Sequence, residues 1–410
     1  MTALYNIGIM IYKVLAHIAA LFSSKAKLWV KGQAGWKDIL KKNISSSDRI
    51  FWIHCSSLGE FEQGRPVIEE MRKQKPDIKI LLTFFSPSGY EIRKNYAGAD
   101  CICYLPADTP SNVAEFLDKA HPELAVFVKY EFWNNYISEL HRRNIPLFLI
   151  SAIFRPDQPF FKWYGSFFSS MLQKFEKIFV QDERSVELLR GIGIANVVRA
   201  GDTRFDRVVQ ISGNAKDIPQ ISSFRKGEKM FLAGSSWGPD EEIIARYINL
   251  DPGKMKWVFA PHEIDEGNIA RIEKLFTSKC VRLSKYNEAS EDARVLIIDN
   301  IGMLSSAYRY ATIAAVGGGF GKGIHNILEP ACWGIPVLFG PGHDKFREAL
   351  ELLKVKGGMT FDSFESFKEI LDKLLNDDEY YLKSATSASH YVNENTGATA
   401  ILMGELVHRI

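Results

Sequence analysis

The residues best suited to chemistry lie in the last third of the chain. Gly317, Gly318 and Gly319 end an apolar run, and His325-Asn326-Ile327-Leu328-Glu329-Pro330 follows at a predicted helix start. Glycines let the backbone approach a ligand, and the N–H groups of a helix start attract anions such as phosphate. Glu329 could accept hydrogen bonds from a vicinal diol such as ribose. The layout favours a nucleotide site, and a glycine-rich turn joining two strands is the alternative.

Two glutamates stand where an apolar strand pattern changes to a helical one. Glu60 follows the strand pattern at 50–54 and a Ser-Ser-Leu-Gly turn, and Glu131 follows the pattern at 124–128. A carboxylate beside a bound ligand can deprotonate an acceptor hydroxyl as a general base. A helix-start glutamate stabilised by the helix dipole is the alternative at each position. Two such carboxylates at strand ends are more suggestive than either one.

Other charged or ring side chains stand at further predicted strand ends. Arg204, in a Gly-Asp-Thr-Arg-Phe-Asp run, could offset the charge of a departing phosphate, or it is a solvated surface arginine. His262, after Pro261, could contact phosphate or base, although a lone histidine is more often structural. Asn300-Ile301-Gly302-Met303-Leu304 begins another predicted helix. The last two segments share a sheet edge with 317–330, which favours a nucleotide site there.

Several well-known ligand motifs are missing from the sequence. There is no G-x-x-x-x-G-K-[ST], and residues 317–323 contain no G-x-G-x-x-G, so the P-loop and dinucleotide fingerprints are excluded. No Asp-x-Asp triplet and no H-E-x-x-H occur either. We therefore expect no metal site, a metal-free reaction and no cofactor.

Strand and helix patterns alternate from Arg49 onward, which predicts parallel sheets wrapped by helices. The predicted strands are 50–54, 78–84, 101–105, 124–128, 146–151, 177–181, 197–200, 230–235, 256–260, 294–298, 312–317, 336–339 and 358–361. Residues 207–228 carry no strong periodicity and are interpreted as an interdomain linker.

The expected organisation is α/β, with two Rossmann-like parallel-sheet domains facing a central cleft and an N-terminal membrane-anchor helix. The expected segments are an apolar anchor helix at 1–24, an acceptor-binding domain at 25–206, a linker at 207–228, a donor-binding domain at 229–381, and a C-terminal helix at 382–410 that could cross back to the first domain.

Composition describes a folded body in a reducing compartment. Of the 410 residues, 46% are hydrophobic and 24% charged, and the net charge of +2 gives no case for nucleic-acid binding. The five cysteines form no C-x-x-C pair and are interpreted as small core residues.

The N-terminal segment is apolar and flanked by positive charge. Residues Leu4 to Phe22 are interrupted only by Asn6, Lys13 and His17, and no Asp or Glu occurs before Asp38. An amphipathic or signal-anchor helix with a basic cytoplasmic flank fits better than a cleaved signal peptide. A helix packed on the first domain is the alternative. The aromatic run at 160–168 could dip into lipid, line an acceptor site, or form a buried helix.

The ordered set of these motifs resembles a known family, the Kdo (3-deoxy-D-manno-octulosonic acid) transferases of Gram-negative lipopolysaccharide synthesis. The resemblance covers nearly the whole chain. It is carried by Trp52-Ile53-His54, Ser57-x-Gly59-Glu60, Glu131-x-Trp133, Arg204-Phe205-Asp206, Ala233-Gly234-Ser235, Ala260-Pro261-His262 and His325-Asn326-x-Leu328-Glu329-Pro330.

The resemblance implies a GT-B fold and an inverting, metal-independent transfer of Kdo from CMP-Kdo to a lipid A precursor (lipid IVA). It implies that Glu60 is the catalytic base and that Glu131 and Arg204 support the transition state. It places the enzyme at the inner membrane, with its catalytic domains on the cytoplasmic side. The residues that it assigns to CMP are Pro261, His262, Gly302, Met303, Leu304, Asn326, Ile327, Leu328 and Glu329.

The chain departs from the family pattern at a few positions. Met303 stands where the family usually has Glu, and Asp202 and Arg204 stand where Asn and Lys are common. Two other functions stay open at this point: another GT-B sugar-nucleotide enzyme, such as a different transferase or an epimerase, and a non-catalytic membrane-attached scaffold.

Overall fold

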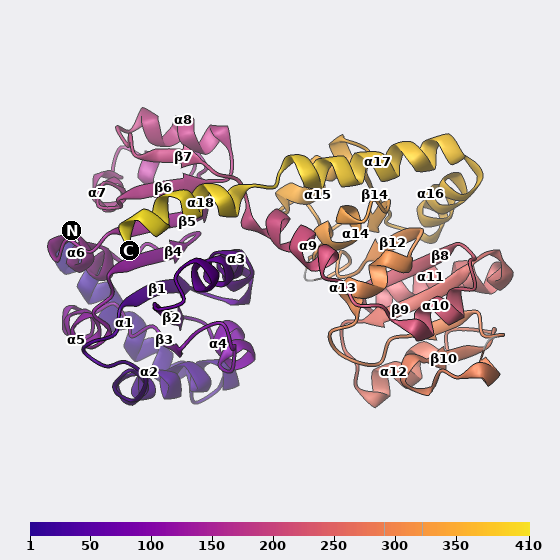
Figure 1. The fold of residues 1–410 in the computed structure, drawn as a ribbon, viewed down its shortest axis with the longest axis horizontal. Helices are drawn as coiled ribbons and strands as arrows, with labels where there is room; N and C mark the ends of the chain where they lie inside the picture. Colours follow the sequence, from indigo (N-terminus) through magenta and orange to yellow (C-terminus); the bar gives the residue numbers. More distant parts are fainter. Residues whose placement is uncertain (291, 322) are drawn as a thin grey trace. The chain divides into compact units, whose positions relative to one another are not determined.

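The computed structural model describes residues 1–290, 292–321 and 323–410, and it divides into two compact units (Figure 1). Unit 1 comprises Met1–Asp206 and Thr396–Ile410, and unit 2 comprises Arg207–Asn395. Within the described residues each unit holds a seven-stranded, all-parallel sheet covered by helices. The predicted α/β class with two Rossmann-like domains is confirmed.

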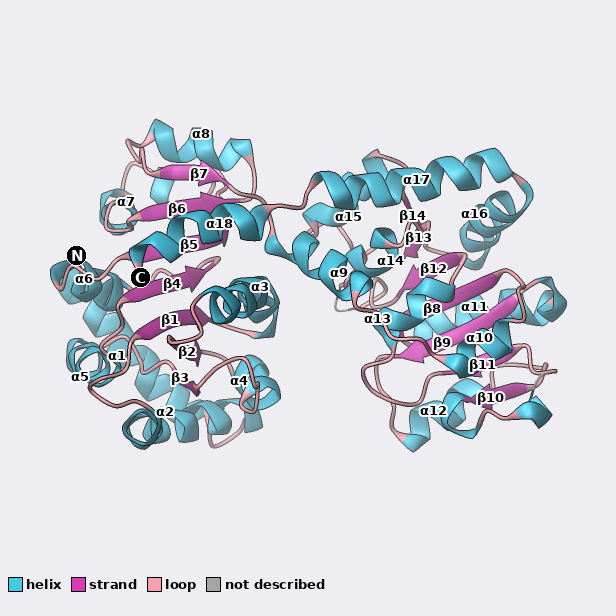
Figure 2. Ribbon diagram, viewed as in Figure 1, coloured by secondary structure: helices cyan, strands magenta, loops and turns pink. Residues whose placement is uncertain are grey.

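The sheet of unit 1 has the strand order β3-β2-β1-β4-β5-β6-β7 (Figure 2, magenta). Strand β1 lies inside the sheet and pairs with β2 and β4, so that Trp52 lies between Leu81 and Ala125. The strands are β1 (Ile50–Cys55), β2 (Lys79–Phe84), β3 (Cys101–Tyr104), β4 (Leu124–Val128), β5 (Leu147–Ala152), β6 (Lys177–Val180) and β7 (Val197–Arg199).

Helices cover both faces of this sheet (Figure 2). They are α1 (Thr2–Ala19), α2 (Ser24–Asn43), α3 (Leu58–Gln74), α4 (Pro87–Arg93), α5 (Pro110–Ala120), α6 (Asn134–Arg142), α7 (Ser166–Leu172), α8 (Glu183–Gly191) and α18 (Ala398–Leu406). Helix α9 (Thr203–Gly213) contains the division between the units.

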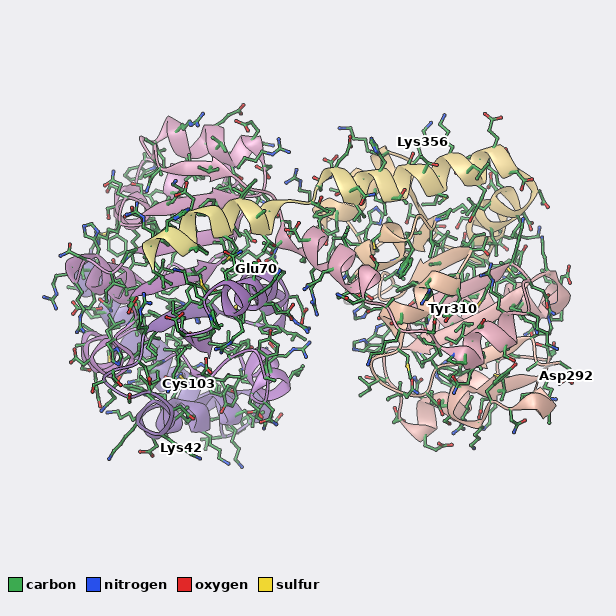
Figure 3. The ribbon with its side chains drawn as sticks, in the orientation of Figure 1. Lys42, Glu70, Cys103, Asp292, Tyr310 and Lys356 are labelled. Atoms are coloured by element: carbon green, nitrogen blue, oxygen red, sulfur yellow. The ribbon has the colours of Figure 1, made fainter. Side chains whose placement is uncertain are left out.

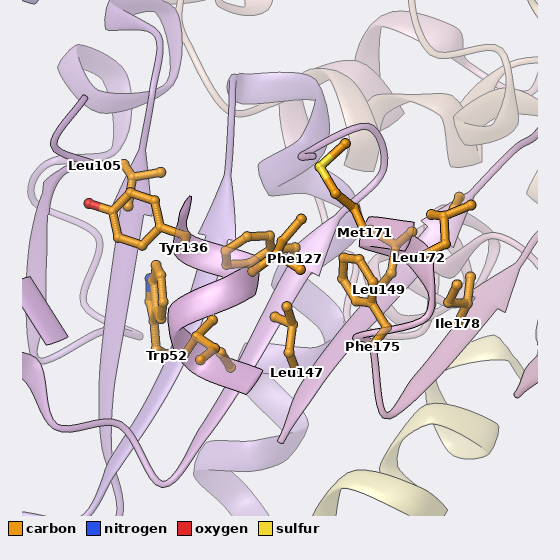
Figure 4. Close-up of a cluster of buried hydrophobic side chains, with 14 of the residues drawn as sticks. Trp52, Leu105, Phe127, Tyr136, Leu147, Leu149, Met171, Leu172, Phe175 and Ile178 are labelled. Carbon is orange, nitrogen blue, oxygen red and sulfur yellow. The ribbon is translucent and has the colours of Figure 1, made fainter. Parts of the chain in front are cut away.

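Alternate residues of the buried strands supply the cores on the two faces of the unit 1 sheet. Trp52, Phe127 and Leu149 pack on one face, as Figure 4 shows. Phe51 and its like-facing neighbours pack on the other face, together with Leu402, Met403 and Leu406 of α18. The C-terminal helix is therefore part of the core of unit 1.

A single side chain ties this helix to the point where the chain leaves unit 1. Asp206 accepts hydrogen bonds from the backbone N–H of Gly397 (2.6 Å) and from the N–H and hydroxyl of Thr399 (2.7 Å each). It thereby caps the start of α18.

The sheet of unit 2 has the order β10-β11-β9-β8-β12-β13-β14. Its strands are β8 (Met230–Ser236), β9 (Lys256–Pro261), β10 (Cys280–Arg282), β11 (Val295–Ile297), β12 (Ile313–Val316), β13 (Val337–Phe339) and β14 (Gly358–Thr360). Its helices are α10 (Pro219–Arg225), α11 (Gly238–Leu250), α12 (Glu266–Glu273), α13 (Leu304–Ala307), α14 (Leu328–Cys332), α15 (Arg347–Lys354), α16 (Phe364–Asn376) and α17 (Asp378–Glu394).

Three local expectations differ from the structure. Strand β10 was not predicted, because it has only three residues and none of them is fully buried. The stretch 207–228 contains the end of α9 and all of α10, since Ile221 and Phe224 are buried although the flanking residues are polar. The C-terminal stretch forms two helices rather than one, because Gly397 adopts a left-handed backbone (φ +103°) between them.

Helix α1 is amphipathic, but it turns polar residues toward unit 1 and leaves much of its apolar side exposed, which is the reverse of a typical helix in a soluble protein. Its partly buried positions include Asn6 and Lys13, whereas Leu4, Ile11 and Ile18 are more than half exposed. Polar contacts hold it to unit 1: the Tyr5 hydroxyl donates to Asp108 (2.5 Å), and Asn6 accepts from Asn135 (2.8 Å). Among the described residues, α1 is the one helix long and apolar enough to cross a membrane.

The aromatic run at 160–168 does not form the buried helix considered from the sequence. It is divided between a short 3-10 turn (Pro159–Phe161) and the start of α7. Phe160 is buried, but Trp163 is 95% exposed and Tyr164 is 49% exposed. Phe167 packs against Tyr5 of α1, with ring centroids 6.0 Å apart. The exposed rings and α1 thus belong to the same region of unit 1.

The cysteines are all free thiols. Cys55, Cys101 and Cys103 are buried, and Cys103 lies inside unit 1 in Figure 3, whereas Lys42 at the end of α2 points outward. Burial raises the pKa of each of these three thiols, which keeps them protonated. They behave as small core residues, as the sequence predicts.

Candidate functional site

Each sheet has one point where the strand order reverses, and the sequence-predicted residues gather beside it. In unit 1 the chain runs from β1 outward to β2 and β3, then returns to β4 on the other side of β1. In unit 2 the same reversal separates β8 from β12. Open parallel sheets bind ligands at the C-terminal strand ends beside such a reversal.

Glu60 lies in the first turn of α3, directly after β1. Its carboxylate is half-buried and accepts a hydrogen bond from the Ser57 hydroxyl. Burial, followed by the negative charges of Glu60, Glu131 and Glu62, raises the pKa of the Cys55 thiol. Glu60 and Glu131 follow the adjacent parallel strands β1 and β4, so both lie at the C-terminal edge of the same part of the sheet.

Glu131 is buried and belongs to a chain of hydrogen bonds that crosses three strands. Its Oε2 accepts from Trp133 Nε1 (2.6 Å) and pairs with His54 Nε2 (2.9 Å). His54 Nδ1 lies 2.9 Å from the Thr83 hydroxyl, which accepts from Trp52 Nε1 at 2.9 Å. A neutral His54 with its proton on Nε2 satisfies every member of this chain. The network fixes the orientation of Glu131.

Arg204 is held in place by a buried aspartate. Asp202 accepts from Arg204 Nε (2.9 Å) and Nη2 (2.7 Å), and also from Gln63 Nε2 (3.1 Å). Burial alone would raise the pKa of Asp202, but the charge and hydrogen bonds of Arg204 outweigh it and lower that pKa. Because Gln63 follows Glu60 by three residues on α3, the arginine is connected to the helix of the proposed base.

The nucleotide segment of unit 2 presents three flat rings. Trp237 and His325 lie nearly in one plane (8°), and Trp237 Nε1 donates to His325 Nε2 (3.0 Å). His262 stacks on both rings, 4.7 Å from Trp237 and 4.5 Å from His325 between ring centroids. Burial, and then His262, lowers the pKa of His325 to about 4. His325 is therefore neutral at pH 7, with its proton on Nδ1.

The predicted CMP segments meet around Glu329. Its Oε2 accepts from the Ser305 hydroxyl (2.8 Å), and its Oε1 accepts from Asn326 Nδ2 (3.1 Å). Ser305 lies directly after the predicted segment 302–304, in which Gly302 is exposed and adopts φ +89°. The 4.5 Å stack of His262 on His325 brings the third segment, with Pro261, to the same place.

The nine residues predicted to bind CMP differ in how far their side chains are exposed. Asn326, His262 and Gly302 are exposed, whereas Met303, Leu304 and Glu329 are half-buried. Pro261, Ile327 and Leu328 are buried, so only their backbone atoms can serve a ligand. The Leu328 N–H already bonds to Asn326 Oδ1 (3.2 Å).

The three consecutive glycines serve packing rather than an open phosphate loop. The Gly317 N–H donates to the Gly234 carbonyl (3.0 Å), and the Gly318 N–H donates to Asp240 (3.0 Å). A Cβ on Gly319 would lie 2.6 Å from the Gly340 backbone. Strand ends pack too closely here for any side chain, which accounts for glycine at these positions. The loop residue 322 lies outside the described residues.

At both reversal points the backbone adopts an unusual conformation where the chain leaves a strand. Lys129 after β4 has φ +67°, and Ser235 near the end of β8 has φ +49°. Non-glycine residues rarely adopt this conformation, and it concentrates at functional sites. Both positions turn the chain immediately before site residues: Glu131 in unit 1 and Trp237 in unit 2.

Some residues of the candidate site received no chemical role from the sequence. His54 interrupts a fully buried strand, and a buried ring nitrogen requires a partner, so its position was the available signal. Trp237 and Asp240 gave no comparable signal, because their importance depends on contacts with residues about 80 positions away in the chain (|i−j| of 88 and 78). The described residues contain no cluster of three or more metal-ligating side chains.

Two Rossmann-like domains, each with a candidate site at its strand reversal, are typical of the GT-B fold. The UDP-GlcNAc 2-epimerase of Neisseria meningitidis, solved with UDP-GlcNAc, superposes with a TM-score of 0.60 over 88% of this chain and 100% of its own, at 17% identity. At that identity the likeness defines the fold.

The sequence comparisons narrow the class. The family model described as 3-deoxy-D-manno-octulosonic-acid transferase matches residues 32–207. The chain is 30% identical to the enzyme of that name from Aquifex aeolicus, over 77% of this chain and 83% of the relative. It is 26% identical to the Haemophilus influenzae enzyme, over 86% and 85%. The chain belongs to the Kdo transferase family and is a glycosyltransferase.

Proposed function

We propose that this enzyme transfers Kdo from CMP-Kdo to a lipid A precursor (lipid IVA), with inversion and without a metal, and that Glu60 is the general base. The observation that supports this most directly is the pair Glu60 and Glu131 at the reversal point of unit 1, in a chain of this family. A half-buried carboxylate that accepts one hydrogen bond, from Ser57, keeps capacity to take a proton.

The reaction forms one bond and breaks one. The acceptor hydroxyl oxygen attacks the anomeric carbon of Kdo while its proton passes to Glu60. The bond from that carbon to the phosphate oxygen breaks on the opposite face, and CMP leaves with the electron pair. Glu131 is suited to offset the positive charge that develops on the sugar ring, because the His54 network fixes its carboxylate. We assign Arg204 to the departing phosphate.

In unit 2 we assign the nine predicted residues to the CMP moiety. A planar base can stack on the ring group of Trp237, His262 and His325. Glu329, held by Ser305 and Asn326, can accept the ribose hydroxyls. Because the Gly317 and Gly318 amides are occupied, we do not assign them to the phosphate.

We further propose that α1 lies in the membrane interface, on the cytoplasmic side of the inner membrane. Its apolar side faces outward, its polar residues bond to unit 1, and Trp163 and Tyr164 are exposed in the same region. Replacing exposed Ile11 with Glu should reduce co-flotation with anionic vesicles several-fold. Unchanged flotation would remove α1 from the contact.

The deciding experiment incubates the protein with CMP-Kdo and tetraacylated lipid A precursor and identifies the product by mass spectrometry. We expect one or more Kdo additions, an inverted anomeric configuration by NMR, and activity retained in EDTA. Calorimetry with CMP and UDP tests the alternative GT-B functions. Tight UDP binding without CMP binding would overturn the proposal, as would failure to modify the acceptor.

A further inference from the structure

Unit 1 contains a cavity of about 590 Å³ beneath its N-terminal helices. Tyr12 and Ala19 of α1 line one side, Trp29 of α2 lines another, and Phe85 of the loop after β2 lines a third. Its volume falls in the range of small-molecule sites. None of the sequence motifs or nucleotide residues described above belongs to it.

The walls of this cavity are apolar and rigid. The rings of Tyr12 and Trp29 meet edge to face with centroids 5.6 Å apart, and Phe85 packs against Trp29 at 5.7 Å. The small side chains of Ala16, Ala19 and Ala26 line it between α1 and α2, where they leave space open, and Leu15 and Pro87 add further apolar surface. A surface of this kind suits a hydrocarbon chain.

One wall of the cavity is connected to both candidate catalytic carboxylates. The backbone N–H groups of Phe85 and Ser86 donate to the Ser56 carbonyl (3.2 and 2.7 Å), in the turn that leads to Glu60. The Phe85 ring also packs on Trp133 (4.7 Å between centroids), which donates to Glu131. A hydrocarbon chain held here would therefore lie near the strand ends that precede Glu60 and Glu131, the carboxylates proposed to act on the acceptor.

The charge around the cavity favours an anionic partner. Lys25 lines it together with Ser23 and Ser86. Lys27 and Lys31 are exposed on the same helix, α2, and the sequence has no Asp or Glu before Asp38. A neutral apolar molecule would gain nothing from this excess of lysine, and an acidic peptide would gain little from the apolar walls, whereas a phosphorylated lipid matches both.

We propose that this cavity holds one acyl chain of the phosphorylated acceptor lipid, with the lysines of α2 beside its phosphate. The assignment rests on the proposed function and adds to it an acyl-chain subsite. It makes the cavity a determinant of acceptor specificity, because a deacylated acceptor would lose this contact while its hydroxyl stayed reactive.

A binding experiment tests the cavity without requiring transfer. The probe is lysophosphatidic acid with a brominated acyl chain, below its critical micelle concentration, and the signal is bromine quenching of tryptophan fluorescence. We expect saturable quenching in the full-length protein and loss of most of it in Trp29→Phe. Ala19→Phe, which fills the cavity, should weaken binding at least tenfold. The matched control Ala3→Phe, on an exposed position of the same helix, should bind within twofold of wild type.

Kinetics identify the occupant. The ratio of kcat/KM for tetraacylated over fully deacylated acceptor should fall at least tenfold in Ala19→Phe and stay unchanged in Ala3→Phe. Equal losses on both acceptors would overturn the proposal in favour of a bulk membrane lipid. Equal behaviour of the two variants in quenching would also overturn it. If wild type modifies neither acceptor while quenching follows the expected pattern, the proposed function fails and the acyl-chain site stands.

Discussion

The two sheets use the same topology for opposite kinds of chemistry. At the reversal point of unit 1, the side chains that matter are carboxylates and a guanidinium held in hydrogen-bonded chains through His54, Trp133 and Asp202. At the reversal point of unit 2 they are flat rings, and the half-buried His325 is neutral. In the proposed function, the edge of unit 1 moves a proton and the edge of unit 2 holds a planar base beside an uncharged His325. The same scaffold position therefore does not dictate the chemistry.

The largest expected effect falls on the strand ends of unit 1 that precede Glu60 and Glu131, here called the carboxylate edge. Glu60→Gln keeps the size of the side chain and its contact with Ser57 but cannot accept a proton. We expect kcat to fall about 10²–10⁴-fold, the usual contribution of a general base, while CMP affinity measured by calorimetry changes less than twofold. Glu70→Ala, on the same helix, is the control. Activity within a few fold of wild type would remove Glu60 from the mechanism.

A second test concerns what holds the carboxylate edge together. His54→Ala leaves the buried Glu131 with Trp133 alone, and we expect a loss of about 3 kcal/mol in the free energy of unfolding of unit 1, measured by chemical denaturation. His141→Ala, which removes an exposed histidine of α6, should cost about 0.5 kcal/mol or less. Similar stabilities for the two variants would show that the His54 contact is dispensable.

The strand ends of unit 2 beside Trp237, His262 and His325 are here called the ring edge. A change there should alter the affinity for CMP. Glu329→Ala removes the acceptor of the Ser305 and Asn326 hydrogen bonds together with the proposed ribose contact, so we expect CMP to bind about tenfold more weakly, the effect of roughly 1.4 kcal/mol. Calorimetry measures this, with the exposed Glu369→Ala of α16 as control. Unchanged affinity would move the donor site elsewhere in unit 2.

The smallest expected effect concerns the hydrogen bond that helps to keep His325 of unit 2 uncharged. Trp237→Phe keeps a flat ring but removes the N–H that bonds to His325 Nε2, which frees that nitrogen to take a proton. The pKa of His325 should rise from about 4 toward its ordinary value, as an NMR titration can show. CMP affinity at pH 7 should fall about threefold, the effect of one neutral hydrogen bond. A pKa that stays low would assign the shift to burial and His262 without a contribution from the Trp237 hydrogen bond.

The low pKa of His325 also determines how the stability of unit 2 changes with pH. Its folded value of about 4 lies below the ordinary 6.5, so the unfolded chain binds more protons between these values and unit 2 loses stability as the pH falls through that window. Asp240 opposes this, because burial raises its pKa from 3.8 to about 6, and its contribution falls as the pH rises from about 4 to about 6. The two groups partly cancel.

The fold was largely predictable, because strands with both faces buried appear as continuous apolar runs, such as Ile50–Cys55. The position of Glu60 after the first strand was predictable for the same reason. The networks were not, since the pairing of His54 with Glu131 spans 77 positions and that of Trp237 with His325 spans 88. The sequence left two roles open for Gly317–Gly319, because close packing and ligand approach favour the same residue type, and the packing contacts appear only in the structure.

The place of α18 in unit 1 has a consequence for biosynthesis. Leu402, Met403 and Leu406 complete one face of the first sheet, and Asp206 holds the start of their helix. On the ribosome these residues emerge only after all of unit 2, so the earlier-made half must wait with part of that face uncovered while the later-made half can finish folding. Folding order would then be the reverse of synthesis order, and a stalled chain would expose the Phe51 side of the sheet to chaperones.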